Sequence, residues 1–180
     1  MSSITVFSGP MKCGKSTRLI NEAKKWKHTD KKIQIFKPFV DNRSFIETIN
    51  DRNGNELNAI NIENIDDIKN YDADVYFIDE FQFLNGNIST IQDMVSDGKQ
   101  FFIAGLNLTA EKKPFGKMGE LICNADSVEM LSSICECCHE NNAIYSFCKV
   151  KKENDILIGD SEYIPVCPSC YNKLDKERRK

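Results

Sequence analysis

The residues in this chain best suited to chemistry stand near its start, in the run Gly9-Pro-Met-Lys-Cys-Gly-Lys-Ser16. This spacing fits G-x-x-x-x-G-K-[ST], in which glycines let the backbone curl until successive N–H groups face the phosphates of a nucleotide. In such a loop Lys15 reaches the β- and γ-phosphates, and the Ser16 hydroxyl ligates Mg²⁺. The alternative is a chance glycine turn with a surface lysine. The flanking pattern argues against it, because an apolar strand enters the run and a helical pattern leaves it.

Two carboxylates follow a second strongly apolar segment. Residues 75–78 form a continuous apolar run, typical of a strand buried on both faces, and Asp79 and Glu80 come directly after it. Because ligands bind at the carboxyl ends of the strands in parallel α/β sheets, we expect this pair beside the phosphate loop. There Asp79 would hold Mg²⁺, directly or through water, and Glu80 would face the γ-phosphate as a base or water-positioning group. The alternative is a solvated Asp-Glu turn.

Two C-x-x-C pairs, Cys135 with Cys138 and Cys167 with Cys170, are separated by 28 residues. Two such turns complete a tetrahedron around Zn²⁺, and a closed shell of four sulfur atoms indicates a structural rather than a catalytic metal. Cys137 lies inside the first pair and competes with Cys138 as the ligand; the spacing favours Cys138. Redox-active cysteine pairs are the competing interpretation.

Composition limits the remaining function classes. The chain has 180 residues, 41% hydrophobic and 28% charged, which suits one domain with a small appendage. The net charge of −3 and the lack of interleaved basic and aromatic residues argue against a nucleic-acid partner, and so against an ATPase acting on nucleic acid. No apolar run approaches the roughly 18 residues of a membrane span, so we expect no membrane partner. With no signal-peptide pattern and eight cysteines, we expect a cytoplasmic protein with reduced thiols.

Apolar strands alternate with helical patterns through the first two thirds of the chain, which predicts β-α-β units and an α/β fold with a parallel sheet. The predicted strands are residues 4–7, 32–36, 57–62, 75–78, 100–104 and 127–131, and the predicted helices are residues 15–27, 65–71 and 88–95. Residues 41–55 are polar and rich in turn formers, which indicates a long loop. Six of the eight cysteines follow Ser132. We therefore expect a nucleotide-binding domain at 1–131 and a zinc-binding domain at 132–180.

Taken together, these motifs resemble the type II thymidine kinase family over nearly the whole chain. Residues 9–17 resemble its opening GPM-x-x-GK-[ST]-T, and both cysteine pairs stand in their family positions. The other matching motifs are Asp41-Asn-Arg43 (D-T/S-R), Asp51-Arg52 (the end of H-D/S-R), Asp79-Glu-Phe-Gln82-Phe83 (D-E-x-Q-F) and Pro114-Phe-Gly116 (P-F-G). Ile158-Gly159, followed by Tyr163 and Cys167, resembles the segment called the lasso, which closes over the thymine.

The resemblance implies a P-loop domain with a small zinc-containing lasso domain, a homotetramer, and ATP-dependent phosphorylation of the thymidine 5′-hydroxyl. It implies Glu80 as the general base and Arg52 as a catalytic residue near the transferring phosphate. The residues implied for ATP and Mg²⁺ are Gly9, Pro10, Met11, Lys12, Cys13, Gly14, Lys15, Ser16, Thr17, Asp79 and Gln82. The residues implied for the nucleoside are Met11, Phe83, Ala110, Ile156, Ile158 and Tyr163, with the lasso contributing backbone hydrogen bonds.

Departures from the family pattern cluster around the base. Where the family pattern has an acidic residue this chain has Asn107, and where it has an aromatic residue this chain has Ala110. The arginine that precedes the lasso in the pattern is replaced by Cys148, and the first glycine of the lasso by Ile158. A methyl group at Ala110 removes stacking area, so we expect weaker thymidine binding or a broader choice of base unless Phe147 or Tyr145 fills the space. The alternatives are a kinase for another pyrimidine deoxynucleoside and a non-catalytic nucleotide-binding homologue. Glu80 argues against the second, because a pure ATP binder needs no base there.

Overall fold

The computed structural model of the chain describes residues 2–39, 48–140, 142–150 and 161–179. Some residues singled out above lie outside these ranges. They are Asp41, Asn42, Arg43, Ile156, Ile158 and Gly159.

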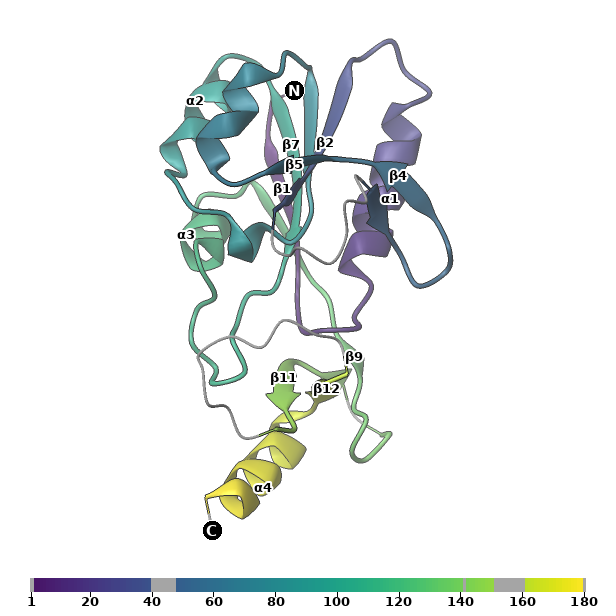
Figure 1. Cartoon of the computed structure of the whole chain (residues 1–180), viewed down its shortest axis with the longest axis vertical. Helices are drawn as coiled ribbons and strands as arrows, with labels where there is room; N and C mark the ends of the chain where they lie inside the picture. Colours follow the sequence, from purple (N-terminus) through teal and green to yellow (C-terminus); the bar gives the residue numbers. More distant parts are fainter. Residues whose placement is uncertain (1, 40–47, 141, 151–160, 180) are drawn as a thin grey trace.

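A six-stranded sheet forms the centre of the molecule (Figure 1). In spatial order its strands are β5 (Ile60–Ile62), β2 (Ile33–Pro38), β6 (Val75–Ile78), β7 (Gln100–Gly105), β1 (Ile4–Ser8) and β8 (Ser127–Met130). Every pairing in it is parallel, which confirms the predicted α/β class. β2 runs two residues further than expected, because Pro38 is its last residue and a proline is tolerated at a strand end. β8 is an edge strand and only half-buried.

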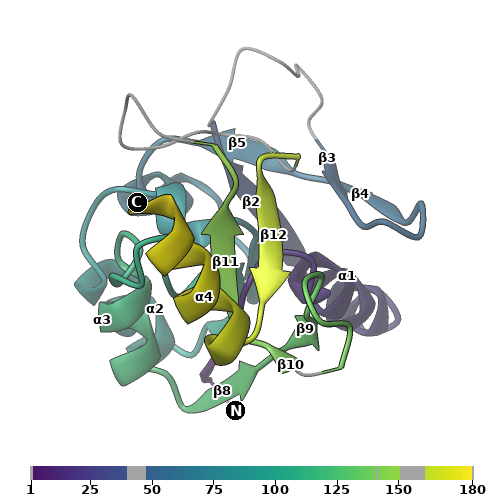
Figure 2. The same cartoon turned by 90° about the horizontal axis from the view of Figure 1, so that it is seen from below.

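Both faces of the sheet are covered (Figures 1 and 2). On one face pack the 3₁₀-helix η1 (Ile65–Asn70) and the helices α2 (Ser89–Ser96) and α3 (Met118–Cys123). On the other lies α1 (Lys15–Trp26) with the short strands β3 (Thr48–Asn50) and β4 (Glu56–Asn58). A single turn of 3₁₀-helix, η2 (Phe81–Phe83), follows β6.

A hydrophobic core lies on each face of the sheet, and the side chains of β6 point alternately into one core and the other. Tyr76 and Ile78 point into the core beneath α2 and α3, while Val75 and Phe77 point into the core beneath α1. The Phe77 ring stacks on Phe102 of β7 with centroids 5.1 Å apart. Side chains alternate between the faces of a strand, so a strand covered on both sides must be apolar throughout, as the sequence indicated.

The predicted loop at residues 41–55 is wrong in its second half. β3 and β4 pair as an antiparallel hairpin whose turn is closed by Asp51. The Asp51 carboxylate accepts hydrogen bonds from the backbone N–H of Asn53 (2.9 Å) and of Asn55 (2.8 Å). An aspartate that bonds its own backbone in this way specifies a turn. The turn residues that suggested a loop therefore form a compact hairpin beside α1.

The C-terminal part lies beyond the carboxyl end of the large sheet (Figure 1). Its elements are β9 (Ser133–Ile134), β10 (Asn142–Ala143), β11 (Tyr145–Cys148), β12 (Tyr163–Val166) and α4 (Pro168–Arg178). β9 pairs with β10 and β11 with β12, both antiparallel, and α4 packs on β11 (Figure 2). Among the described residues, no helix combines the length and apolar character needed to cross a bilayer.

Candidate functional site

The phosphate loop joins β1 to α1. Gly14 stands in the left-handed region (φ 86°) just before the helix, and the Arg18 N–H donates to its carbonyl oxygen (2.9 Å). Gly9, at φ 152°, passes so close to the backbone of Leu131 that any side chain would collide with it. The Lys15 side chain is buried, and its ammonium group donates to the carbonyl oxygen of Pro10 (2.7 Å) across the loop. The loop is therefore closed around a buried positive charge.

Asp79 ends β6 on the same side of the sheet as this loop. Its side chain is 5% exposed. Burial, followed by the neighbouring charge of Glu80, raises its pKa to about 7, while the Ser16 hydroxyl and the Lys15 charge act in the opposite direction. These opposing effects show that Asp79 faces both Ser16 and Lys15. Asp79 therefore lies beside the phosphate loop, as the sequence predicts.

Glu80 has a strained backbone, with φ 51° and ψ 38°. A non-glycine residue in this region persists only where its surroundings hold it, and such strain gathers at functional sites. The Gln82 amide donates to the Glu80 carboxylate (2.5 Å) and accepts from the Leu106 N–H (2.9 Å). Gln82, expected to bind the nucleotide, thus orients Glu80. Its amide lies so close to Gly105 that a side chain there would clash with it.

Arg52 lies exposed in the turn of the β3–β4 hairpin. Its neighbour Asp51 is buried: burial acts to raise the pKa of Asp51, but hydrogen bonds from Asn55, Asn53 and Thr17 hold it below its ordinary value. The Thr17 contact ties the hairpin to the first turn of α1. Arg52 therefore stands on a turn anchored beside the phosphate loop.

Lys37, at the end of β2, was not found by sequence reasoning. Its ammonium group donates to the Thr48 carbonyl oxygen (3.0 Å). Burial lowers its pKa, and the charge of Asp79 acts in the opposite direction, so the two side chains face each other. The signal that would have found it is a lysine at the carboxyl end of a strand adjacent to β6.

Three predicted nucleoside residues come together. Met11 packs against a buried cluster of Ala110, Cys148 and Tyr163. Phe83 instead packs edge-to-face on Phe115, with ring centroids 5.3 Å apart. A residue of the phosphate loop therefore packs in one cluster with residues from the middle and the C-terminal part of the chain.

The suggested aromatic replacements for Ala110 are wrong. Tyr145 and Phe147 pack on Tyr171 in the core of the C-terminal part, because alternation along β11 sends Cys148 to the other face. Tyr171, which sequence reasoning missed, donates its hydroxyl to the Ala110 carbonyl oxygen (2.6 Å). No local pattern marks that contact, since 61 residues separate the two.

The sulfur atoms of Cys135, Cys138, Cys167 and Cys170 lie within 4.8 Å of one another. Those of Cys138 and Cys167 are 4.0 Å apart, near the roughly 3.8 Å edge of a tetrahedron with 2.3 Å zinc–sulfur bonds. Cys137 is exposed and lies outside this group.

The cluster's electrostatics also suit a metal. Burial and then the neighbouring cysteine side chains raise the pKa of Cys170. For Cys135, burial acts to raise the pKa, yet backbone N–H groups of residues 167, 138 and 137 hold it below its ordinary value. Crowded thiols with backbone donors aimed at them are arranged for a cation, so the residues fit Zn²⁺. All eight cysteines are free of disulfides.

Comparison with known proteins agrees with this arrangement. A family model described as thymidine kinase matches residues 2–171. A thymidine kinase of Pseudothermotoga lettingae is 32% identical over 95% of this chain and 95% of its own length. One of Mycoplasma mobile is 35% identical over 98% of this chain and 90% of its own length. The thymidine kinase 1 of Dictyostelium discoideum is 33% identical over 97% of this chain and 79% of its own length.

Proposed function

Because the chain belongs to the thymidine kinase family, we propose that it transfers the γ-phosphoryl group of ATP to the 5′-hydroxyl of thymidine. The observation that carries this proposal is the position of Met11. This residue belongs to the phosphate loop, yet its side chain packs on the Ala110, Cys148 and Tyr163 cluster. A nucleoside in that cluster would lie beside a nucleotide in the loop, as phosphoryl transfer requires.

The loop residues fit ATP with Mg²⁺. Residues 9–17 present backbone N–H groups and the buried Lys15 ammonium to the phosphates. Ser16 and Asp79 face each other and offer the hydroxyl and carboxylate oxygens that Mg²⁺ prefers. When bound, Mg²⁺ neutralises charge on the phosphates. The raised pKa of Asp79 supports this assignment. Neighbouring groups of the protein do not fully stabilise the charged form of this buried carboxylate, so a bound cation would stabilise it.

We assign Glu80 as the general base that accepts the proton of the 5′-hydroxyl. Its carboxylate is fixed by Gln82, and general bases of this kind contribute about 10²- to 10⁴-fold in rate. Arg52 would approach the transferring phosphate from the anchored hairpin. Gln82 would serve the nucleotide side of the site through Glu80, and the partly exposed Phe83, which packs on Phe115, would contact the nucleoside.

The nucleoside would contact Met11, Ala110 and Tyr163, with backbone groups near Ile156 and Ile158 completing the pocket. Cys135, Cys138, Cys167 and Cys170 would hold one structural Zn²⁺. Because these cysteines bracket the whole segment between β10 and β12, the metal would fix both of its ends.

We also propose two domains, residues 1–131 and 132–180, a homotetramer and a cytoplasmic location. The separate core of Ala143, Val166 and Tyr171, built only from residues after 132, supports the division. The unpaired cysteines, including exposed Cys123 and Cys137, support a reducing compartment.

The test is incubation of the zinc-loaded protein with ATP, Mg²⁺ and a panel of nucleosides, with products identified by mass. We expect dTMP and ADP from thymidine, with Glu80→Gln as the matched inactive control. Phosphorylation of deoxyuridine or deoxycytidine but not thymidine would favour the alternative pyrimidine kinase, which the small side chains at Ala110 and Cys148 make the second candidate. ATP binding without any product would identify a non-catalytic homologue.

A further inference from the structure

The phosphate loop contacts later parts of the chain at three successive places, and the second and third lie in the cysteine-bearing C-terminal part. Gly9 lies against the backbone of Leu131, whose N–H donates to the carbonyl oxygen of Ser8 (2.7 Å). The Met11 N–H donates to the Ser146 hydroxyl (2.9 Å). The Lys12 ammonium group pairs with the Glu136 carboxylate (2.8 Å). A loop that must wrap the phosphates is thus held from outside by residues more than 120 positions away.

The loop needs such support at these residues. Lys12 has φ 62°, in the left-handed region, although it is not a glycine. A non-glycine residue pays a conformational cost there, so neighbouring contacts must fix the backbone. The two polar contacts with side chains of the C-terminal part are made here. Met11, just before the strained residue, bonds Ser146, and Lys12, the strained residue itself, pairs with Glu136.

Both supporting residues are themselves fixed. Ser146 is buried in β11, which pairs with β12. Glu136 stands between Cys135 and Cys137, and its N–H donates to the Pro165 carbonyl oxygen (2.9 Å) in β12. The backbone of both residues is held by β12, next to the cysteine cluster, so the cluster determines where the two contacts with the loop lie.

We propose that Glu136 and Ser146 are positioning residues for the phosphate loop, acting through Lys12 and Met11, so that nucleotide affinity depends on the C-terminal part. This inference rests on the proposed function, because it takes ATP or ADP as the ligand of the loop. It assigns Lys12 as an anchor of the loop rather than as a phosphate ligand. It also makes the cysteine-bearing part a determinant of nucleotide binding, in addition to its place beside the nucleoside.

The test measures ADP binding by calorimetry on full-length, zinc-loaded protein, with melting temperature and zinc content recorded for every variant. Ser146→Ala should weaken ADP binding about 3- to 10-fold, as expected for one lost hydrogen bond, and Ser146→Thr should restore it. Glu136→Gln should weaken ADP binding about 2- to 3-fold, because the ion pair is partly exposed. Glu140→Gln, an exposed acid in the same turn, is the control and should bind ADP like the wild type.

A double-mutant cycle separates the two possible roles of Lys12. If Lys12 is an anchor, Lys12→Met and Glu136→Gln have equal effects, and the double variant is no weaker than either single variant. If Lys12 binds phosphate, Lys12→Met weakens ADP binding while Glu136→Gln tightens it, and the proposal is overturned. It is also overturned if both Ser146→Ala and Glu136→Gln bind ADP like the wild type. Wild-type protein that binds no nucleotide would instead refute the proposed function.

Discussion

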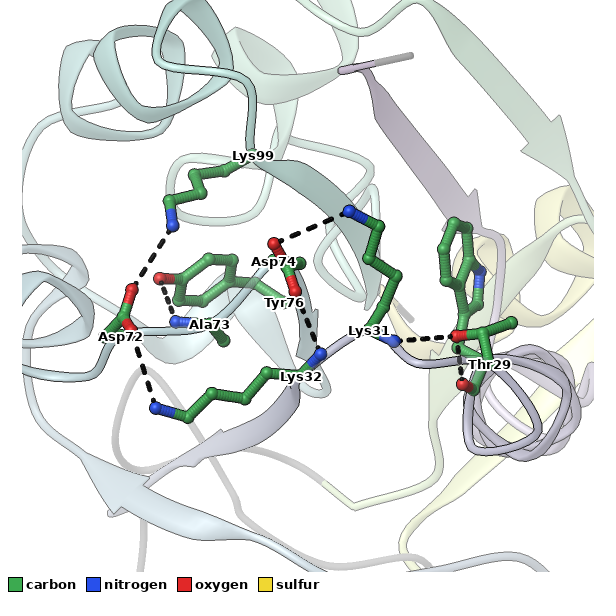
Figure 3. A network of polar contacts seen from close by, with 9 residues as sticks. Thr29, Lys31, Lys32, Asp72, Ala73, Asp74, Tyr76 and Lys99 are labelled. Carbon is green, nitrogen blue, oxygen red and sulfur yellow. Dashed lines mark hydrogen bonds and ion pairs between the residues drawn. The ribbon is translucent and has the colours of Figure 1, made fainter.

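The two ends of the central sheet are built on opposite electrostatic principles. At the amino ends of β2, β6 and β7, every charge in the network of Figure 3 faces an opposite one. Asp72 lies between Lys32 (3.5 Å) and Lys99 (3.3 Å), and Asp74 pairs with Lys31 (3.8 Å) and accepts from the Lys32 N–H (2.9 Å). These side chains are largely exposed, so solvent screens them and their contribution to stability is small.

At the carboxyl ends of the same strands, two like charges adjoin where solvent is scarce: Asp79 is buried and the neighbouring Glu80 is half-buried. Asp79 and Glu80 are consecutive carboxylates, Glu80 has a strained backbone, and the pKa of Asp79 is raised first by burial and then by Glu80. One sheet thus has an end whose charges pair in solvent, and an end where the buried Asp79 keeps a raised pKa although Lys15 and Lys37 face it. The difference points to the functional end without reference to any motif, because strongly shifted pKa values gather at functional sites.

The largest expected effect at the carboxyl end is that of Glu80→Gln. Removing the proton acceptor should lower kcat by about 100-fold or more, while ADP affinity stays within about 2-fold of the wild type. Steady-state kinetics and calorimetry on the same preparation check both. Near-normal kcat with chemistry rate-limiting would mean that another group takes the proton. Lys15→Ala is the contrasting variant, and it should lose nucleotide binding as well as turnover.

The cysteine cluster is the next most sensitive feature of this end of the molecule. Cys167→Ser should abolish binding of one zinc per chain and lower the melting temperature by about 10 °C or more, because a structural metal contributes folding free energy directly. Cys137→Ser is the matched control: its exposed thiol lies outside the cluster, so zinc content should be unchanged. Metal analysis measures the zinc content of each variant, and thermal melts measure its stability. Zinc loss in the Cys137 variant with retention in a Cys138→Ser variant would reverse the ligand assignment.

Nucleoside binding at the cluster of Ala110, Cys148 and Tyr163 should strengthen when an aromatic ring is added. Ala110→Phe places a ring beside Tyr163 and should lower KM for at least one of thymidine, deoxyuridine and deoxycytidine by about 5-fold or more, at unchanged KM for ATP. The measurement is kcat and KM for each nucleoside. A wild type that already binds thymidine tightly, together with a variant that loses that binding through a clash, would show that the pocket has no room for a ring.

The buried carboxylate should cost stability in a pH-dependent way. The pKa of Asp79 is about 7 in the folded protein and 3.8 without the fold, so stability is full below pH 3.8 and falls as pH rises towards 7. Asp79→Asn removes this penalty while keeping an oxygen for the Glu80 N–H. Without magnesium or nucleotide, the variant should melt about 3 °C or more above the wild type at pH 8, and the difference should vanish near pH 4.

Asp51→Asn is the control of opposite sign. The folded-state pKa of Asp51 is lowered, so its contribution to stability is present at neutral pH and is lost as pH falls through that lowered value. The variant should therefore melt below the wild type at pH 7 and approach it in acid. Melting curves of both variants from about pH 2 to pH 8 make the comparison, because the Asp51 contribution is lost only below pH 3.8. Parallel shifts at all pH values would contradict the assigned causes.

Local patterns in the sequence were enough to predict the sheet, its parallel pairing and the elements that carry the phosphate loop. The run at 75–78 could be interpreted because a strand covered on both sides leaves a continuous apolar signature. The β3–β4 hairpin could not, because three-residue strands with polar exposed faces resemble a loop. Its order comes from Asp51 bonding the backbone of residues 53 and 55, which composition alone does not reveal.

The supporting residues of the site escaped sequence reasoning for a different reason. Motif spacing identifies groups that touch a ligand, such as Lys15 and Glu80. Ser146 and Tyr171 act on residues 135 and 61 positions away, and only the fold brings these pairs together. Gln82 was found by its motif, but its place beside Glu80 depends on the tight approach of Gly105, which belongs to another strand.

The smallest expected effect belongs to the amino end of the sheet. Asp72→Asn removes both ion pairs of a side chain that is 82% exposed, so the melting temperature should change by less than about 2 °C and the kinetic constants should not change. Raising the salt concentration to about 1 M should shrink even that difference, because the Debye length then falls to about 3 Å, comparable with the ion-pair distances. Thermal melts at low and high salt, beside the nucleoside assay, measure both quantities. A loss of activity in Asp72→Asn comparable to that of the Glu80→Gln variant would mean that the two ends are coupled, and that balanced charge does not mark a purely structural edge.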